Sequence, residues 1–359
     1  LPFENYIYDE YSAPSSLFIS RKNNDGNYEF LPDLFEGSQG GNYDAINKNY
    51  RFDITRHVNE ILAEKIINDT IKIFPNGNGI TANRVVLNGM NSTKKDIRAL
   101  SKEELRTFFT THGDQAFRGT QVYEWLWKKG AHHFEDMTNL SKNTRQMLDE
   151  NFSINHIEVD SMQRSSDGTI KNGIRLHDGM IVESVLIPTA KRSTACVSSQ
   201  VGCSLDCKFC ATSRLKRMRN LNPDEIYDQV VAIDKQSKLY HNRPLSNIVF
   251  MGMGEPLMNY NNVLKAIDKI TSDEGLGMSP KRIVVSTSGV PKMIKKMADD
   301  QVKFNLAVSL HSAIDSVRST IMPFNETFPL KDLREALQHW YAVTKRIITY
   351  EYVVWEGIN

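Results

Sequence analysis

The cysteines of this 359-residue chain are confined to one short stretch, and that placement limits what the chain can fold into. All four lie within fifteen positions, at Cys196, Cys203, Cys207 and Cys210. A secreted protein stabilised by disulfides would spread its cysteines across long loops. The cluster instead indicates a metal site in a reducing compartment, so we expect a cytoplasmic protein.

Composition excludes several classes of protein. Hydrophobic residues make up 40% of the chain and aromatic residues 9%, which excludes an intrinsically disordered or collagen-like sequence. A formal net charge of +1 excludes a protein that grips nucleic acid or anionic lipid through bulk charge alone. The sequence contains no run of about 18 apolar residues, so we expect no membrane span.

The character of the sequence changes near residue 90. Residues 1–89 carry eight basic and twelve acidic side chains, and short apolar runs between turn signals predict a β-rich segment with one helix at about 54–68. Met90 reads as a fresh N-terminus, and Ser101 and Glu104 form a capping box that begins a helix. Residues 1–89 are therefore either an appended, unrelated domain or the product of two joined reading frames, and we favour the second.

Periodicity divides the remainder into three regions. Helical spacing of apolar residues predicts a helical domain over 90–152, and residues 153–195 read as a short antiparallel β extension. From residue 196 onward strands and helices alternate, which predicts an α/β fold with a partial (β/α) barrel over 196–359 and a site at the strands' carboxyl ends. The predicted strands are 247–251, 282–287, 304–310 and 347–354, and the predicted helices are 224–238, 261–271, 291–298 and 330–343.

Residues 117–129 of the helical domain mix aromatic and cationic side chains. Such a mixture can stack bases and hold phosphates, so we expect this domain to bind RNA. The alternative is that Trp125 and Leu126 face a core while Lys128 and Lys129 are solvated.

Three of the cysteines, Cys203, Cys207 and Cys210, have the spacing C-x3-C-x2-C. Three thiolates on one loop suit a 4Fe–4S cubane whose fourth iron has no protein ligand. Zinc is the alternative, but structural zinc needs a fourth ligand, and no histidine lies between 196 and 210. Cys196 could be that ligand, so the spacing by itself leaves both metals open.

The wider pattern resembles that of radical S-adenosylmethionine enzymes. Phe209 precedes the third cysteine, where those enzymes carry an aromatic residue, and Met251–Pro256 resembles their GGEP-type motif. More narrowly, residues 92–359 resemble the RlmN family of RNA adenine-C2 methyltransferases, and the sister C8 methyltransferases share much of the pattern. The matching segments are Gln121–Lys129, Cys196–Cys203, Arg219–Leu221, Met251–Leu257, Ser286–Val290 and Ser309–His311.

The resemblance implies methylation of adenosine C2 in 23S rRNA and tRNA by a radical route. In that family a 4Fe–4S cluster cleaves S-adenosylmethionine, and a methyl group carried on a cysteine is joined to the base as a protein–RNA adduct. A second cysteine then resolves the adduct by forming a disulfide. The resemblance also implies an electron donor such as flavodoxin or ferredoxin, and we expect a monomer.

Roles carry over from the family residue by residue. Cys203, Cys207 and Cys210 fall on the cluster ligands, and Cys196 falls on the adduct-resolving cysteine. Glu183 matches a proposed proton acceptor, although it could equally be a solvated strand residue. The S-adenosylmethionine contacts fall on Gly254, Glu255, Ser286, Ser309, Leu310 and His311.

Basic residues flank the cysteines on both sides and predict a rim that neutralises RNA phosphates. A solvated charged loop is the alternative. The residues of this predicted rim are Lys191, Arg192, Arg214, Lys216, Arg217 and Arg219.

One departure from the family pattern concerns the methyl-carrying cysteine. In the resembled sequences it lies near the C-terminus, whereas this chain has no cysteine after Cys210. We therefore expect a chain truncated at Asn359, which binds the cluster but does not complete methyl transfer as it stands. Two other interpretations stay open, an RNA-binding pseudoenzyme and a different radical S-adenosylmethionine enzyme that acts on a protein or a small molecule.

Overall fold

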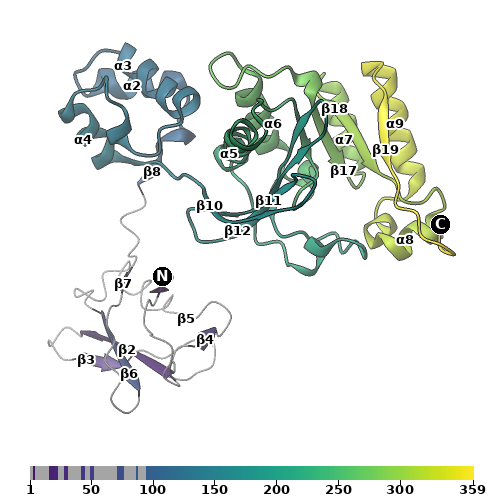
Figure 1. Cartoon of the computed structure of the whole chain (residues 1–359), viewed down its shortest axis with the longest axis horizontal. Coiled ribbons are helices and arrows are strands. Elements are labelled where there is room, and N and C mark those ends of the chain that lie inside the picture. Colours follow the sequence, from purple (N-terminus) through teal and green to yellow (C-terminus); the bar gives the residue numbers. More distant parts are fainter. Residues whose placement is uncertain are drawn as a thin grey trace. The chain divides into compact units, whose positions relative to one another are not determined.

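The computed structural model describes residues 94–359 throughout and, before them, only the backbone of the short strands β1–β7. The chain divides into two compact units, 1–94 and 95–359 (Figure 1). The described part of the first unit is β-structure, as expected, and the helix predicted over 54–68 lies outside the described residues. Its antiparallel pairs are β2 (Ser16–Lys22) with β3 (Tyr28–Phe30) and β6 (Ile71–Asn76), β1 (Phe3–Glu4) with β7 (Val86–Leu87), and β4 (Asn42–Asp44) with β5 (Asn49–Arg51).

The second unit begins with a small helical domain. The capping box forms as expected, because the Ser101 hydroxyl accepts from the Glu104 N–H and the Glu104 carboxylate accepts from the Ser101 N–H. Gly119 lets two helices approach closely, since a Cβ there would lie 2.5 Å from the backbone nitrogen of Arg106. The elements are β8 (Lys95–Asp96), α2 (Lys102–Thr111), α3 (Phe117–Glu124), the π-helical turn η2 (Trp125–Lys129), α4 (Lys142–Asn151) and β9 (Phe152–Ser153).

One eight-stranded sheet runs through the rest of the unit, in the order β10-β11-β12-β13-β16-β17-β18-β19. The first four strands pair antiparallel, and from β13 to β19 every pair is parallel. The expected antiparallel extension is therefore continuous with the barrel sheet. The strands are β10 (Glu158–Arg164), β11 (Ile170–Arg175), β12 (Ile181–Pro188), β13 (Ser193–Cys196), β16 (Asn247–Phe250), β17 (Ile283–Thr287), β18 (Asn305–Ser309) and β19 (Ile348–Glu351).

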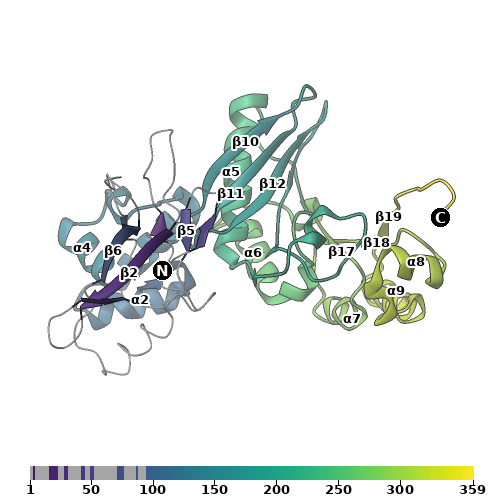
Figure 2. The same cartoon turned by 90° about the horizontal axis from the view of Figure 1, so that it is seen from below.

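Helices follow the parallel strands as the sequence predicts, and one short helix, α8, was not predicted. Figures 1 and 2 show α5 beside β12, and the contacts place α6 against α5 and α7 against α9. No helix in residues 94–359 is long and apolar enough to cross a membrane. The helices are α5 (Pro223–His241), α6 (Tyr260–Thr271), α7 (Pro291–Asp299), α8 (Asp315–Ile321) and α9 (Leu330–Thr344). A separate antiparallel pair is formed by β14 (Gln200–Val201) and β15 (Arg219–Asn220). The short helical turns are η1 (Ile97–Ala99), η3 (Phe134–Asp136), η4 (Ala211–Arg214), η5 (Pro256–Asn259), η6 (Pro280–Arg282) and η7 (Pro323–Glu326).

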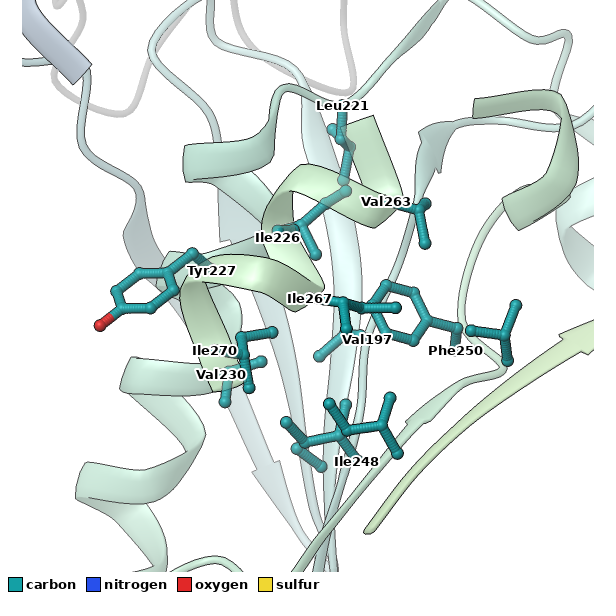
Figure 3. Close-up of a cluster of buried hydrophobic side chains, with 14 of the residues drawn as sticks. Val197, Leu221, Ile226, Tyr227, Val230, Ile248, Phe250, Val263, Ile267 and Ile270 are labelled. Carbon is teal, nitrogen blue, oxygen red and sulfur yellow. The ribbon is translucent and has the colours of Figure 1, made fainter. Parts of the chain in front are cut away.

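Alternation along β16 separates the hydrophobic core from the site. Ile248 and Phe250 are buried and pack among apolar side chains of α5 and α6, such as Val230 and Ile267 (Figure 3). Successive strand side chains point to opposite faces, so Val249 and its register partners lie on the other face of the sheet. That second face carries the candidate site.

Candidate active site

Four polar side chains share the face of the sheet that lies opposite the helices. In parallel strands, register partners and residues two apart along a strand point to the same face. Cys196 pairs with Val249 and Val249 with Val284, Ser286 pairs with Ala307, and Ser309 pairs with Glu351. Ser286 lies two residues after Val284, and Ser309 lies two residues after Ala307. Cys196, Ser286, Ser309 and Glu351 therefore share one face, near the strands' carboxyl ends.

The other three cysteines lie on the loop that follows β14. Cys203, Cys207 and Cys210 all pack on one apolar cluster that includes Ile321 and Met322. The pKa of the Cys207 thiol is raised to about 12, mainly by burial and in part by the neighbouring thiols of Cys203 and Cys210. Because the three loop thiols act on one another's pKa values, their sulfur atoms lie close together. The Cys196 thiol does not take part in this interaction. All four cysteines are free of disulfides.

The three loop thiols suit an iron–sulfur cluster, which takes cysteine thiolates as its ligands. Thiols whose pKa is raised by burial and by one another gain most from cationic iron, which stabilises the thiolate. Cys196 lies on β13 rather than on the loop, which disfavours the zinc alternative.

A buried arginine that the sequence did not suggest supports this loop and its neighbours. Arg318 is fully buried, and its guanidinium donates to the backbone carbonyls of Ser288, Ser309 and Leu310. Its positive charge also lowers the pKa of the Cys207 thiol, against the larger effect of burial. Arg318 thus joins helix α8 to the carboxyl ends of β17 and β18, and its charge acts on the cysteine loop.

Gly254 and Glu255 form a tight turn beside the cysteines. Gly254 has φ +93°, and a Cβ there would lie 2.4 Å from the Cβ of Gln200, so only glycine fits. Glu255 is 2% exposed, and its carboxylate accepts from the N–H groups of Leu257 and Ser288 at 3.0 and 2.7 Å. Burial raises the pKa of this carboxyl, and its charge is felt at the thiols of the cysteine loop.

The segment after β18 is held in an unusual conformation. His311 is buried with φ +56°, and the N–H groups of Leu310 and His311 both donate to the carbonyl of Glu351. The Nδ1 atom of His311 accepts from the N–H of Val353, so the neutral ring carries its proton on Nε2. Burial lowers the pKa of His311, and its ring lies 4.5 Å from that of Phe209 on the cysteine loop.

Comparison with known proteins agrees with this geometry. Residues 95–154 match the family described as ribosomal RNA large subunit methyltransferase N-terminal domain, and residues 197–359 match the radical SAM superfamily. The probable dual-specificity RNA methyltransferases RlmN of Flavobacterium johnsoniae and Flavobacterium psychrophilum are 76% and 78% identical over 270 residues, which is 75% of this chain and 77% and 78% of theirs. The chain belongs to the RlmN family of radical SAM RNA methyltransferases.

A solved structure agrees with the RlmN-family assignment. The crystal structure of a radical SAM methyltransferase from Sphaerobacter thermophilus superimposes with a TM-score of 0.69 at 35% identity, covering 74% of this chain and 78% of that one. The α/β radical SAM fold predicted from the sequence is thereby confirmed. Members of the radical SAM superfamily use a 4Fe–4S cluster and S-adenosylmethionine.

The two candidate catalytic residues of this RlmN-family chain lie on neighbouring strands. Cys196 pairs with Val185 of β12, so Glu183, two residues along β12, is on the same face. Cys196 is 9% exposed, and burial raises the pKa of its thiol to about 11. The Glu183 side chain is 51% exposed and lies 2.5 Å from the Lys171 ammonium, at the rim of the site.

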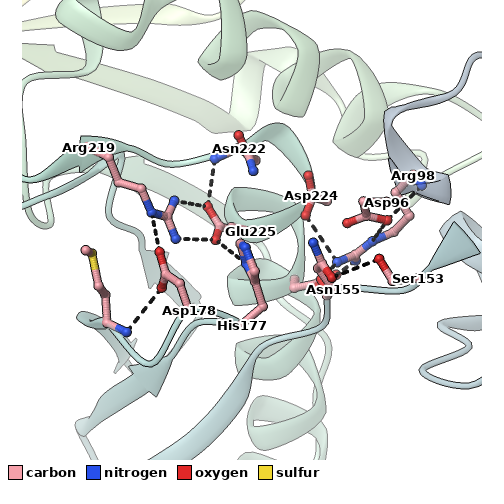
Figure 4. A network of polar contacts seen from close by, with 12 residues as sticks. Asp96, Arg98, Ser153, Asn155, His177, Asp178, Arg219, Asn222, Asp224 and Glu225 are labelled. Atoms are coloured by element: carbon pink, nitrogen blue, oxygen red, sulfur yellow. Dashed lines mark hydrogen bonds and ion pairs between the residues drawn. The ribbon is translucent and has the colours of Figure 1, made fainter. Parts of the chain in front are cut away.

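The predicted basic rim needs one correction. Five of its six residues are exposed, but Arg219 is bound within the protein (Figure 4). Its guanidinium donates to both carboxylate oxygens of Glu225 and to Asp178, and His177 lies 3.3 Å from Glu225. These carboxylates already use the hydrogen-bond donors that a phosphate would need, so Arg219 is a structural residue. The remaining rim consists of Lys191, Arg192, Arg214, Lys216 and Arg217.

The aromatic and cationic helix is largely structural as well. Leu126 is buried and Lys128 and Lys129 are exposed, as the core interpretation predicts, and Trp127 is buried as well. Trp125 is only partly buried, and the Lys129 ammonium lies 4.3 Å from the centre of one of its rings. Trp125, Lys128 and Lys129 therefore remain available to a ligand.

Proposed function

We propose that this enzyme serves the methylation of carbon C2 of adenosine in 23S rRNA and tRNA, a reaction whose methyl-carrying cysteine is none of the four cysteines of residues 1–359. The observation that carries the proposal is the proximity of three mutually interacting thiols, the buried Glu255 carboxylate and the separate Cys196 thiol. C2 of adenine is an electron-poor carbon that does not attack an electrophilic methyl group as an amine does. A 4Fe–4S cluster with S-adenosylmethionine supplies the one-electron chemistry that such a carbon requires.

The chain's own residues would hold these groups. Cys203, Cys207 and Cys210 supply three thiolate ligands, which leaves one iron open to a substrate. Gly254 lets the main chain approach the methionyl ammonium closely, and the Glu255 carboxylate next to it supplies the opposite charge.

Two further residues would handle protons and sulfur at the base. Because of its raised pKa, the Cys196 thiol keeps its proton at neutral pH until a base removes it. Glu183 lies on the same face of the sheet, at the rim where a base would enter, and is our candidate proton acceptor. The Lys171 ammonium lies against this carboxylate at the rim.

RNA would be held by the exposed rim of basic residues and by Trp125. An adenosine that reaches a site at the end of a β-sheet must be unstacked, which favours loops and single-stranded regions of RNA. We further propose a monomer in the cytoplasm that is reduced by flavodoxin or ferredoxin. The sister reaction at C8 is the second candidate, because the resemblance extends to that family.

Deletion and complementation of the gene test the proposal directly. Nucleosides from purified 23S rRNA and tRNA would be measured by mass spectrometry in the parent, the deletion strain and complemented strains. We expect 2-methyladenosine to disappear on deletion and to return with the wild-type gene but not with Cys207→Ala. Loss of 8-methyladenosine instead would move the activity to C8, and unchanged RNA would favour a different radical SAM reaction or a pseudoenzyme.

A further inference from the structure

Glu351, the last residue of β19, connects two residues of the candidate cofactor site. Its Oε2 atom accepts hydrogen bonds from the hydroxyls of Ser286 and Ser309, each at 3.1 Å. Both serines match S-adenosylmethionine contacts of the family, whereas Glu351 was not predicted from the sequence as a site residue. The carboxylate therefore lies inside the site and is bonded to two of its expected contacts.

The position of Glu351 is fixed by the sheet. It is the register partner of Ser309, so its side chain shares the site face with Ser286 and Cys196. Its negative charge also raises the pKa of the Cys196 thiol, after the larger effect of burial. Glu351 thus stands at the carboxyl end of the sheet, where it can reach a ligand that extends from the cysteine loop.

The carboxylate lacks a cationic partner. In residues 94–359, no Lys, Arg or His side chain forms an ion pair with it, and both serine hydroxyls bond the same oxygen atom, Oε2. A partly buried carboxylate is stable when donors satisfy both of its oxygens. The Oε1 atom therefore needs a hydrogen-bond donor or a positive charge, and we expect a ligand to supply it.

The two serines indicate which part of the ligand Glu351 contacts. Each hydroxyl donates its hydrogen to Glu351, so towards a ligand Ser286 and Ser309 present only lone pairs. The three side chains form one surface of acceptors, which repels the carboxylate of S-adenosylmethionine and suits its ribose diol. Carboxylates recognise ribose hydroxyls in this way in other nucleotide sites.

We propose that Glu351 binds the ribose hydroxyls of S-adenosylmethionine and holds Ser286 and Ser309 as acceptors beside it. The inference rests on the proposed function, because it takes S-adenosylmethionine as the ligand. The Glu255 carboxylate binds the ammonium in that arrangement, so the two carboxylates bind different parts of one molecule.

Calorimetric titration of the anaerobically reconstituted enzyme tests the contact without turnover. The probes are S-adenosylhomocysteine, its 2′-deoxy analogue and S-adenosylmethionine. We expect Glu351→Gln to weaken binding of the first and third by about 10- to 100-fold, as loss of a charge-assisted hydrogen bond predicts. The 2′-deoxy analogue should lose less affinity, because one of its donors is already missing.

Controls separate a ligand contact from a supporting role. Glu335→Gln, which removes an exposed carboxylate on α9, should leave all affinities unchanged, and melting curves establish that each variant folds. Glu351→Gln should also weaken binding in a Ser286→Ala/Ser309→Ala background. If it adds no loss there, Glu351 acts only through the serines, and the proposed contact is wrong.

The remaining outcomes are equally decisive. Unchanged binding in Glu351→Gln would overturn the inference while leaving the proposed function intact. Weaker binding of S-adenosylmethionine alone would assign the carboxylate to the sulfonium instead of the ribose. A wild-type enzyme that binds none of the probes would contradict the proposed function itself.

Discussion

The guanidinium of Arg98 lies 2.7 Å from the carboxylate of Asp228, and this ion pair joins the start of the helical domain to helix α5. Arg98 also bonds Asp224 and the carbonyl of Asn155, and its side chain is 3% exposed. One buried cation therefore serves several groups on both sides of a domain boundary. Its loss should affect the fold more than the loss of any surface charge.

Arg98→Met should destabilise the protein by about 3–5 kcal/mol, because it leaves buried carboxylates without a cation. The matched control is Arg106→Met, which removes an exposed arginine that lies 3.6 Å from Glu103 on the same helix and should cost at most about 1 kcal/mol. Urea denaturation followed by circular dichroism measures both. Equal midpoints for the two variants would contradict the role assigned to Arg98.

Asp224 should make stability depend on pH. Burial raises its pKa from 3.8 to about 7, because Arg98 is shared with Asp96 and Asp228 and cannot offset the whole cost. The folded state therefore binds the proton more tightly than the unfolded state. This contribution to stability is complete below pH 3.8 and is lost as the pH rises through about 7.

The variant that tests this linkage is Asp224→Asn, which cannot ionise. Its unfolding free energy should fall less steeply than that of the wild type as the pH rises to neutrality. Asp96, whose pKa burial also raises, should leave a residual slope of the same sign. Parallel pH profiles for variant and wild type would show that Asp224 is not the titrating group.

Gly254→Ala should abolish binding of S-adenosylhomocysteine. The added Cβ would lie 2.4 Å from the Cβ of Gln200, so the turn that presents Glu255 must move. Gly179→Ala is the control, because Gly179 also has a positive φ but has no atom within 4 Å of the added Cβ, and we expect a cost of about 1–2 kcal/mol with unchanged binding. Binding by Gly254→Ala at wild-type affinity would exclude this turn from the site.

The corrected rim predicts a division among the arginines and lysines that follow the cysteines. Lys216→Ala and Arg217→Ala should each lower the salt dependence of binding to a tRNA by about one phosphate contact. Arg219→Ala should leave that dependence unchanged and should lower the melting temperature instead, because Glu225 loses its bidentate partner. Filter binding over a salt series distinguishes the two effects. A change in the salt dependence of tRNA binding in Arg219→Ala would show that Arg219 belongs to the RNA-binding rim.

Cys196 should be unreactive toward iodoacetamide at neutral pH. Its thiol has a pKa of about 11, and alkylation requires the thiolate, so the rate should rise about tenfold per pH unit up to that value. Peptide mapping after brief labelling of the native and urea-unfolded chain isolates Cys196 from the other cysteines. Glu351→Gln should raise its reactivity, and labelling at the unfolded rate in the native chain would contradict the pKa.

Much of the fold could be predicted because its signals are local. Caps and apolar periodicity located α5, α6, α7 and α9 to within a few residues, and strand–helix alternation gave the parallel order. Helix α8 was not predicted because its seven residues are too few to show a helical period of apolar residues. The continuity of the antiparallel strands with the barrel sheet depends on pairing between β12 and β13, which no local pattern encodes.

The candidate site was less accessible to sequence reasoning, for a related reason. The family motifs marked the expected ligand contacts, whereas Arg318 and Glu351 are found only through their hydrogen bonds to residues distant in the sequence. Arg219 was misassigned because a basic run looks the same whether its side chains face solvent or a carboxylate. Only the fold brings Asp178 and Glu225 to it.

The pairing of β12 with β13 has a consequence for the order in which the enzyme can be built. A ribosome releases β11, β12 and β13 in sequence, and short loops join them, so closing this meander requires little loss of chain entropy. The strand that carries Cys196 thus gains a paired neighbour while β16 is still unsynthesised. We therefore expect the antiparallel strands to pair first and the parallel strands to add to β13 afterwards.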